Sequence, residues 1–109
     1  MRDLGDGSIR TFAQNNPDGA VVLITANWCG DPCESLVPIL ELIAAENPHV
    51  AFARADLNQN REFAAEMGIT GIPTILGLIN GECVCRSSFP RDKATIEADL
   101  EKVLSYAAS

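Results

Sequence analysis

A continuous apolar run, AVVLITA at residues 20–26, constrains the fold more than any other segment of this sequence. The run is rich in β-branched residues and lacks polar alternation, which is typical of a central strand buried on both faces. A second run of the same kind, VAFARADL, occupies residues 50–57. Because a helical segment at residues 33–46 separates the two runs, we expect them to be parallel strands joined by a right-handed crossover.

The remaining segments continue this alternation of helices and strands. Residues 8–15 and 60–68 each predict a short helix. The turn NGE at residues 80–82 predicts a hairpin whose strands occupy residues 74–79 and 83–88. A C-terminal helix is predicted from apolar residues at helical spacing, namely Ile96, Leu100, Val103, Leu104 and Ala107.

This order predicts an α/β fold with a central mixed sheet of four to five strands, helices on both faces and a single domain over residues 1–109. With 47% hydrophobic and 21% charged residues, the chain has enough apolar material for one packed core. Pro38 lies inside the helix predicted for residues 33–46. A proline there removes a backbone hydrogen bond, so we expect a kink.

The charge balance and the cysteines bear on partners and location. A net charge of −7 argues against nucleic-acid binding, which needs clustered Lys and Arg. No stretch reaches the roughly 18 consecutive apolar residues of a membrane span, and the first residues lack the apolar segment of a signal peptide. We therefore expect a cytoplasmic protein with no nucleic-acid or membrane partner, in which the four cysteines are catalytic, metal-binding or free.

Two of these cysteines, Cys29 and Cys33, bracket a turn in NWCGDPCES at residues 27–35. Cys29 follows the first apolar strand and precedes a helix N-terminus, whose free N–H groups and dipole stabilise a thiolate. Cys33 is expected to be more enclosed in the first helical turn. That position suits it to attack a mixed disulfide formed on Cys29.

Three segments give the chain a resemblance to the thioredoxin family over nearly its whole length. ANWCGDPC at residues 26–33 resembles the family's A-x-W-C-G-P-C, DLNQN at residues 56–60 resembles its strand end, and GITGIPTILGLINGE at residues 68–82 resembles its G-x-x-G-I-P-T segment and hairpin. Because both flanks align, the extra residue between the cysteines is Asp31. The resemblance implies a thioredoxin fold and an enzyme that reduces protein disulfides.

The resemblance also implies roles for individual residues. Cys29 would be the nucleophile and Cys33 the resolving thiol, with a redox disulfide between them, and Pro73 would be a cis-proline facing this pair. The other residues that would shape the site are Trp28, Gly30, Asp31, Pro32, Ile72 and Thr74. A thioredoxin-reductase-type donor would supply electrons to a monomer that acts on disulfide-containing proteins in cell redox homeostasis. We expect no metal and no cofactor, because the chain has no dinucleotide or phosphate-loop motif.

Three positions depart from the family pattern. The family's buried aspartate, six residues before the first cysteine, is Leu23 here, which cannot accept a proton from the resolving thiol. Its lysine partner on the next strand is Arg54. We expect Arg54 either to form an ion pair or, as the preferred interpretation, to extend from the core to solvent. A family glycine near the end of the last strand is Phe89, which would alter the substrate groove.

The inserted Asp31 has two interpretations that coexist. As a helix cap, supported by Pro32 in the first helical position and by Glu34, it would contribute about 1 kcal/mol. As an acid between two thiols, it would oppose the thiolate of Cys29. The wider spacing is compatible with a disulfide, because residues four apart on a helix have Cα atoms about 6 Å apart, within the bonding range of about 4.4–6.8 Å.

Cys83 and Cys85 are predicted to lie on one face of the last strand, with Val84 opposite, as small buried hydrophobic residues. The alternatives are a four-sulfur zinc or iron–sulfur site shared with the first pair, or an exposed second redox or dimerising site. For the whole chain, the alternatives to disulfide reduction are a shifted redox poise and a thioredoxin-fold binding module without efficient exchange.

Overall fold

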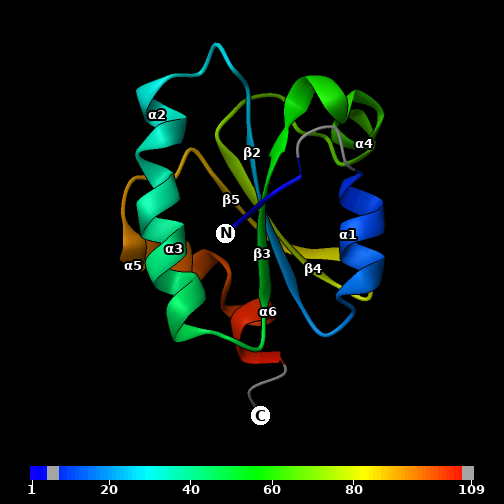
Figure 1. Cartoon of the computed structure of the whole chain (residues 1–109), viewed down its shortest axis with the longest axis vertical. Helices are drawn as coiled ribbons and strands as arrows, with labels where there is room; N and C mark the ends of the chain where they lie inside the picture. The colour runs from blue at the N-terminus through cyan, green and yellow to red at the C-terminus, as the bar shows by residue number, and fades with distance from the viewer. Residues whose placement is uncertain (5–7, 107–109) are drawn as a thin grey trace.

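The computed structural model describes residues 1–4 and 8–106, which form a mixed sheet with helices on both faces (Figure 1). The strands are β1 (Arg2–Asp3), β2 (Ala20–Thr25), β3 (Ala51–Asp56), β4 (Thr74–Ile79) and β5 (Glu82–Ser88). The helical elements are α1 (Ile9–Asn15), α2 (Asp31–Glu34), α3 (Leu36–Glu46), the 3₁₀ turn η1 (Leu57–Gln59), α4 (Arg61–Glu66), α5 (Lys93–Asp99) and α6 (Glu101–Tyr106). The predicted α/β class and mixed sheet are confirmed, with the strand order β1-β3-β2-β4-β5.

Strand β2 lies at the centre of the sheet and sets the position of the cysteine loop. It pairs in parallel with β3, where Leu23 is opposite Arg54, and antiparallel with β4, where Ile24 is opposite Thr74. The carboxyl end of β2 therefore lies beside the amino end of β4. The loop from β2 to α2 and the segment before β4 consequently meet at one edge of the sheet.

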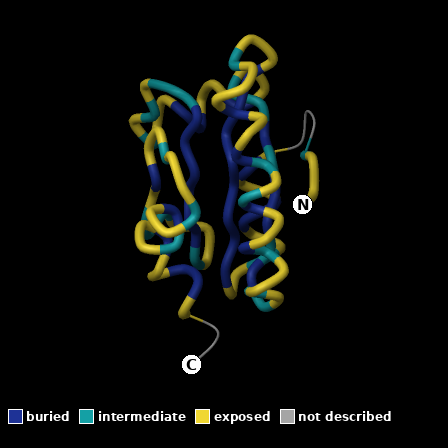
Figure 2. Tube along the Cα trace, turned by 90° about the vertical axis from the view of Figure 1, so that its left-hand side faces the viewer, coloured by how far each residue is buried: buried dark blue, intermediate teal, exposed yellow. Residues whose placement is uncertain are grey.

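Two apolar cores lie on opposite faces of the sheet, and alternate residues of β2 enter each of them. Val21 and Leu23 pack with residues of α3, α5 and α6, whereas Val22 and Ile24 pack with residues of α1 and α4. Every residue of β2 is buried, as predicted, and Figure 2 shows the buried segments gathered in the middle of the molecule. Each such side chain contributes about 1.5–3 kcal/mol by leaving water, so the cores fix β2 firmly.

The helices are shorter than the sequence predicts, and none of those described has the length and apolar character needed to cross a membrane. A break at Ser35 separates α2 from α3, three residues before Pro38. Pro38 has no N–H to donate to the Glu34 carbonyl, so the regular hydrogen bonding ends one turn before the proline. The C-terminal helix is interrupted at Leu100, which divides it into α5 and α6, and Ala107 lies outside the described residues.

Candidate active site

Cys29 and Cys33 are joined by a disulfide, with their Cα atoms 5.9 Å apart. Strand β2 leads to Cys29 through a tight turn, in which the Cys29 N–H donates to the Ala26 carbonyl at 3.0 Å. The two cysteines differ in accessibility, because Cys33 is 1% exposed whereas Cys29 is only half-buried. The wider spacing therefore allows the pair to close, and an incoming disulfide reaches Cys29 more readily than Cys33.

Gly30, not Asp31, is the residue before the first turn of α2, which corrects the predicted cap. Gly30 has φ 70°, a conformation that favours glycine, and its carbonyl accepts hydrogen bonds from the N–H groups of Cys33 and Glu34 at 3.1 and 3.0 Å. Asp31 is the first helical residue, and its exposed side chain makes no capping hydrogen bond. The prediction was wrong because the inserted residue extends the helix itself, and Pro32 follows it within the first turn.

The segment before β4 lies at the same edge of the sheet as the disulfide loop. Its Ile72–Pro73 peptide bond is cis, as the resemblance implies. Thr74 pairs with Ile24 of β2, and its hydroxyl donates to the Gly71 carbonyl at 2.8 Å. This hydrogen bond closes the turn around the cis bond and fixes it beside the end of β2.

Arg54 forms an ion pair that anchors the turn carrying Cys33. Its guanidinium bonds both carboxylate oxygens of Glu34, with Nη1 3.2 Å from Oε2, and its Nε donates to the Thr25 hydroxyl at 3.3 Å. The hydrogen bond from Arg54 lowers the pKa of Glu34, and the same bond raises the pKa of Arg54. The preferred interpretation of Arg54 was wrong, because α2 brings a carboxylate to its guanidinium.

Leu23 lies in the core below this anchor and is fully buried. It packs in one cluster with Leu36 and Leu40 of α3 and pairs in register with Arg54. A leucine side chain neither accepts nor donates a proton. Position 23 consequently offers no buried carboxylate that could accept a proton from a neighbouring thiol.

Two large apolar side chains, Trp28 and Phe89, are 66% and 58% exposed. The Phe89 N–H donates to the Pro73 carbonyl at 3.0 Å, which places Phe89 beside the cis bond. Phe89 has φ 51°, a conformation that glycine adopts freely and that is unusual for an aromatic residue. Its ring lies over Gly71, where an added Cβ would come within 2.7 Å of the ring Cζ. The departure from the family glycine therefore covers part of this edge with an aromatic ring.

Cys83 and Cys85 lie on opposite faces of β5, contrary to the prediction. A bulge interrupts the pairing with β4, because Cys83 is opposite Leu78 and Cys85 is opposite Gly77, which leaves Val84 as the extra residue. Cys83 packs against the core that contains α1 and α4, and Cys85 packs against the other core. Burial raises the pKa of the Cys85 thiol, which lowers its reactivity as a nucleophile.

The four-sulfur alternative is not supported by this arrangement. Cys29 and Cys33 are bonded to each other, while Cys83 and Cys85 point into different cores. Within residues 1–4 and 8–106, no three His, Cys, Asp or Glu side chains come together in a way that would hold a metal ion.

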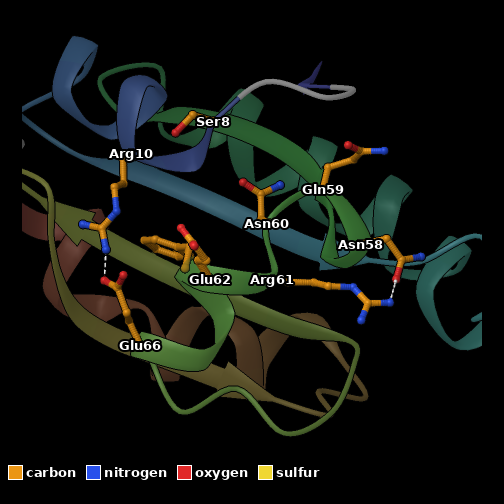
Figure 3. Close-up of a pocket in the computed structure, with 9 residues that line it drawn as sticks. Ser8, Arg10, Asn58, Gln59, Asn60, Arg61, Glu62 and Glu66 are labelled. Carbon is orange, nitrogen blue, oxygen red and sulfur yellow. Dashed lines mark hydrogen bonds and ion pairs between the residues drawn. The ribbon is translucent and has the colours of Figure 1, made fainter.

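A separate polar hollow of about 430 Å³ is lined by residues of α1, η1 and α4 (Figure 3). Three of its charged side chains are engaged with one another or with neighbouring groups. Arg10 forms an ion pair with Glu66 and lies 5.3 Å from the centre of the Phe63 ring, and Arg61 donates to Asn58 at 3.1 Å. No residue predicted for the redox site lines this hollow, so it is not part of that site.

A cysteine pair with one accessible and one buried member can exchange with a second disulfide once a reductant has opened it to thiols. Attack by the freed thiolate breaks the second disulfide, and the buried thiol then restores the original bond. The fold and the cysteine pair thus define the class of this protein as a thiol–disulfide oxidoreductase.

Comparison with known proteins identifies the family. The family model Thioredoxin matches residues 7–102. A thioredoxin of Chlamydia trachomatis is 36% identical over 90 residues, which are 82% of this chain and 87% of the relative. A bifunctional thioredoxin reductase/thioredoxin of Mycobacterium leprae is 36% identical over 94 residues, 85% of this chain and 20% of the relative. The X-ray structure of Fasciola hepatica thioredoxin has a TM-score of 0.77 and 30% identity, covering 94% of this chain and 99% of that one. The chain belongs to the thioredoxin family.

Proposed function

We propose that this protein reduces disulfide bonds in other proteins, with Cys29 as the nucleophile and Cys33 as the resolving thiol. The observation that carries the proposal is the contrast between half-buried Cys29 and Cys33 at 1% exposure. The Cys29 thiolate attacks one substrate sulfur and forms a mixed disulfide, while the other substrate sulfur leaves as a thiolate and takes a proton. The Cys33 thiolate then attacks the Cys29 sulfur, and the second substrate thiol is released. Two electrons and two protons thereby pass to the substrate.

The residues around the pair have supporting roles in this proposal. Gly30 permits the turn, and the ion pair between Arg54 and Glu34 holds the segment that carries Cys33. The residues that shape the surface met by a substrate are Trp28, Gly30, Asp31, Pro32, Ile72, Pro73 and Thr74.

A further part of the proposal is the source of electrons. The oxidised pair is returned to thiols by a thioredoxin-reductase-type partner, because the chain itself has no dinucleotide-binding motif. The name of the Mycobacterium leprae relative, which joins a thioredoxin reductase and a thioredoxin in one protein, supports this partner. We also propose that the protein is a monomer of one domain. We place it in the cytoplasm, where a reducing environment keeps the pair available.

Reduction of insulin disulfides by dithiothreitol, followed with and without this protein, tests the proposal. We expect wild type to accelerate the reaction, Cys29→Ser to abolish the acceleration, and Cys33→Ser to accumulate a mixed disulfide on Cys29 that mass spectrometry detects. Cys83→Ser is the matched control, because it removes a cysteine outside the pair. Equal rates of insulin reduction for wild type and Cys29→Ser would refute the proposed reductase function.

A binding module without efficient exchange is the second candidate. Two observations favour it: Leu23 replaces a buried acid, and Asp31 adds a negative charge between the cysteines. Such a module would retain partner proteins equally well in wild type and in the Cys29→Ser variant, as measured by affinity capture. If the protein is an enzyme, the Cys33→Ser variant instead retains partner proteins through a mixed disulfide, and this retention is lost when Cys29 is also replaced.

A further inference from the structure

Two exposed aromatic side chains lie at the end of the sheet where the disulfide opens to solvent. Trp28 directly precedes Cys29, and Phe89 bonds through its N–H to the Pro73 carbonyl. The register of β2 with β4 brings the segment that contains Pro73 beside the strand end that leads to Cys29. A peptide whose disulfide reaches Cys29 therefore approaches the edge of the sheet that carries both residues.

The Phe89 ring is held over the backbone rather than folded into the core. Its left-handed φ of 51° is unfavourable for a side chain with a Cβ, so the backbone stores strain at this residue. The ring lies so close to Gly71 that a Cβ there would be 2.7 Å from its Cζ. Because Gly71 has no Cβ, it leaves room for the ring, and 58% of the Phe89 residue surface still faces solvent.

We propose that Phe89 determines substrate specificity, because its ring forms an apolar wall against which the residue next to a substrate cysteine packs. The inference rests on the proposed function, since it concerns the substrate of that reaction. A substrate with an aliphatic or aromatic side chain beside its disulfide buries apolar surface on this ring. A substrate with a small polar residue at the same place gains nothing from the contact.

The test uses two disulfide-linked peptide dimers that differ only in the residues flanking the cysteine, which are Leu in one and Ser in the other. A third substrate, bis(2-hydroxyethyl) disulfide, has no side chains, and dithiothreitol returns the cysteine pair to thiols after each turnover, with its direct reaction subtracted. We expect wild type to reduce the Leu peptide with a kcat/KM about five-fold above that of the Ser peptide, a smaller ratio than full burial in a pocket gives. In Phe89→Gly this ratio falls close to one, through a higher KM for the Leu peptide.

Two further variants separate a contact on the ring from a general structural effect. Gly71→Ala keeps Phe89 but displaces its ring, so we expect it to lower the ratio as well. Leu42→Ser is the matched control, because Leu42 is an equally exposed apolar residue, at 59%, on α3, and we expect the wild-type ratio. Thermal unfolding of each variant checks that it is folded.

The outcomes distinguish the two proposals. A preference for the Leu peptide that stays unchanged in Phe89→Gly and Gly71→Ala, or that is absent in wild type, would overturn the role of Phe89 alone. Failure of wild type to reduce even bis(2-hydroxyethyl) disulfide would overturn the proposed function, and the role of Phe89 with it.

Discussion

Arg54 on β3 holds the carboxylate of Glu34, the residue that directly follows Cys33 in the chain. This ion pair connects a central strand to α2, a four-residue helix that is separated from α3 at Ser35. The turn with the buried cysteine is therefore anchored by a contact at the protein surface, in a protein whose core position 23 is a leucine.

The first prediction concerns the pH dependence of this anchor. Because Arg54 lowers the pKa of Glu34 in the folded protein, the ion pair stabilises the fold above the ordinary carboxyl pKa of about 4.3, and this stabilisation is lost as the pH falls through the folded pKa. We expect Glu34→Gln to be less stable than wild type at about pH 7 and equally stable at about pH 2. Urea unfolding at both pH values measures this difference.

The control for this prediction is Glu62→Gln, which removes an exposed glutamate on α4. Its stability relative to wild type should show no comparable change with pH. A constant difference between Glu34→Gln and wild type at all pH values would contradict an electrostatic anchor.

The second prediction concerns the inserted residue. Deletion of Asp31 restores the family spacing, and we expect it to raise the rate of insulin reduction and to shift the reduction potential measured against glutathione. The physical reason is twofold, since the deletion shortens the loop and removes a charge that opposes the Cys29 thiolate. Asp31→Asn separates these effects, because it removes the charge and keeps the spacing. If neither variant changes the rate, the potential or the thiol titration, the insertion is neutral.

The third prediction places an acid in the core. Leu23 is fully buried, so Leu23→Asp should lower the free energy of unfolding by about 3 kcal/mol or more at neutral pH. Burial raises the pKa of the new carboxyl in the folded state. The part of the penalty that comes from ionisation is consequently absent while the carboxyl is protonated in both states, and it grows as the pH rises above the ordinary Asp pKa of about 3.9, whereas the loss of the buried leucine side chain remains at every pH.

Leu23→Asn is the matched control for this variant, because it has nearly the same shape and does not ionise. We expect the reductase rate of Leu23→Asp to gain a pH dependence that Leu23→Asn lacks, if a buried carboxyl here accepts the proton of Cys33. Identical pH profiles for the two variants would show that position 23 does not communicate with the cysteines.

The fourth prediction concerns the close packing of β4 against β5 and α6. A Cβ added at Gly77 would lie 2.5 Å from the Cys85 Sγ and 2.8 Å from the Val103 Cγ1, so Gly77→Ala should lower stability by about 2 kcal/mol. Cys85→Ala removes one of these contacts, and the double variant should lose less stability than the sum of the single variants. Chemical denaturation of the four proteins measures this coupling. Strictly additive effects would show that the sulfur is not the obstacle.

The parts of the fold that the sequence predicts well depend on local patterns. The run at residues 74–79 coincides with β4, and the Asn80–Gly81 turn adopts the positive φ values that this hairpin type requires. Strand β2 is predicted equally well, because an apolar run without polar alternation indicates a strand that is buried on both faces.

The parts that sequence analysis missed depend on partners far away in the chain. The bulge at Val84 arises from the pairing of β5 with β4, and no residue pattern within CVCRSS reveals it, so an alternation rule placed Cys83 and Cys85 on one face. The ion pair of Arg54 with Glu34 could not be predicted without knowing that α2 approaches β3. The contact of Phe89 with Gly71 likewise joins two loops that only the folded sheet brings together.

The separation of α2 from its flanking elements has a consequence for engineering. Strand β2 and helix α3 are each fixed by their own core contacts, and the break at Ser35 releases the intervening segment from the regular hydrogen bonding of α3. The number of residues between the cysteines can then change without altering the register of the sheet. A series of insertions and deletions in this loop would vary how readily the disulfide accepts electrons, while the rest of the scaffold stays unchanged.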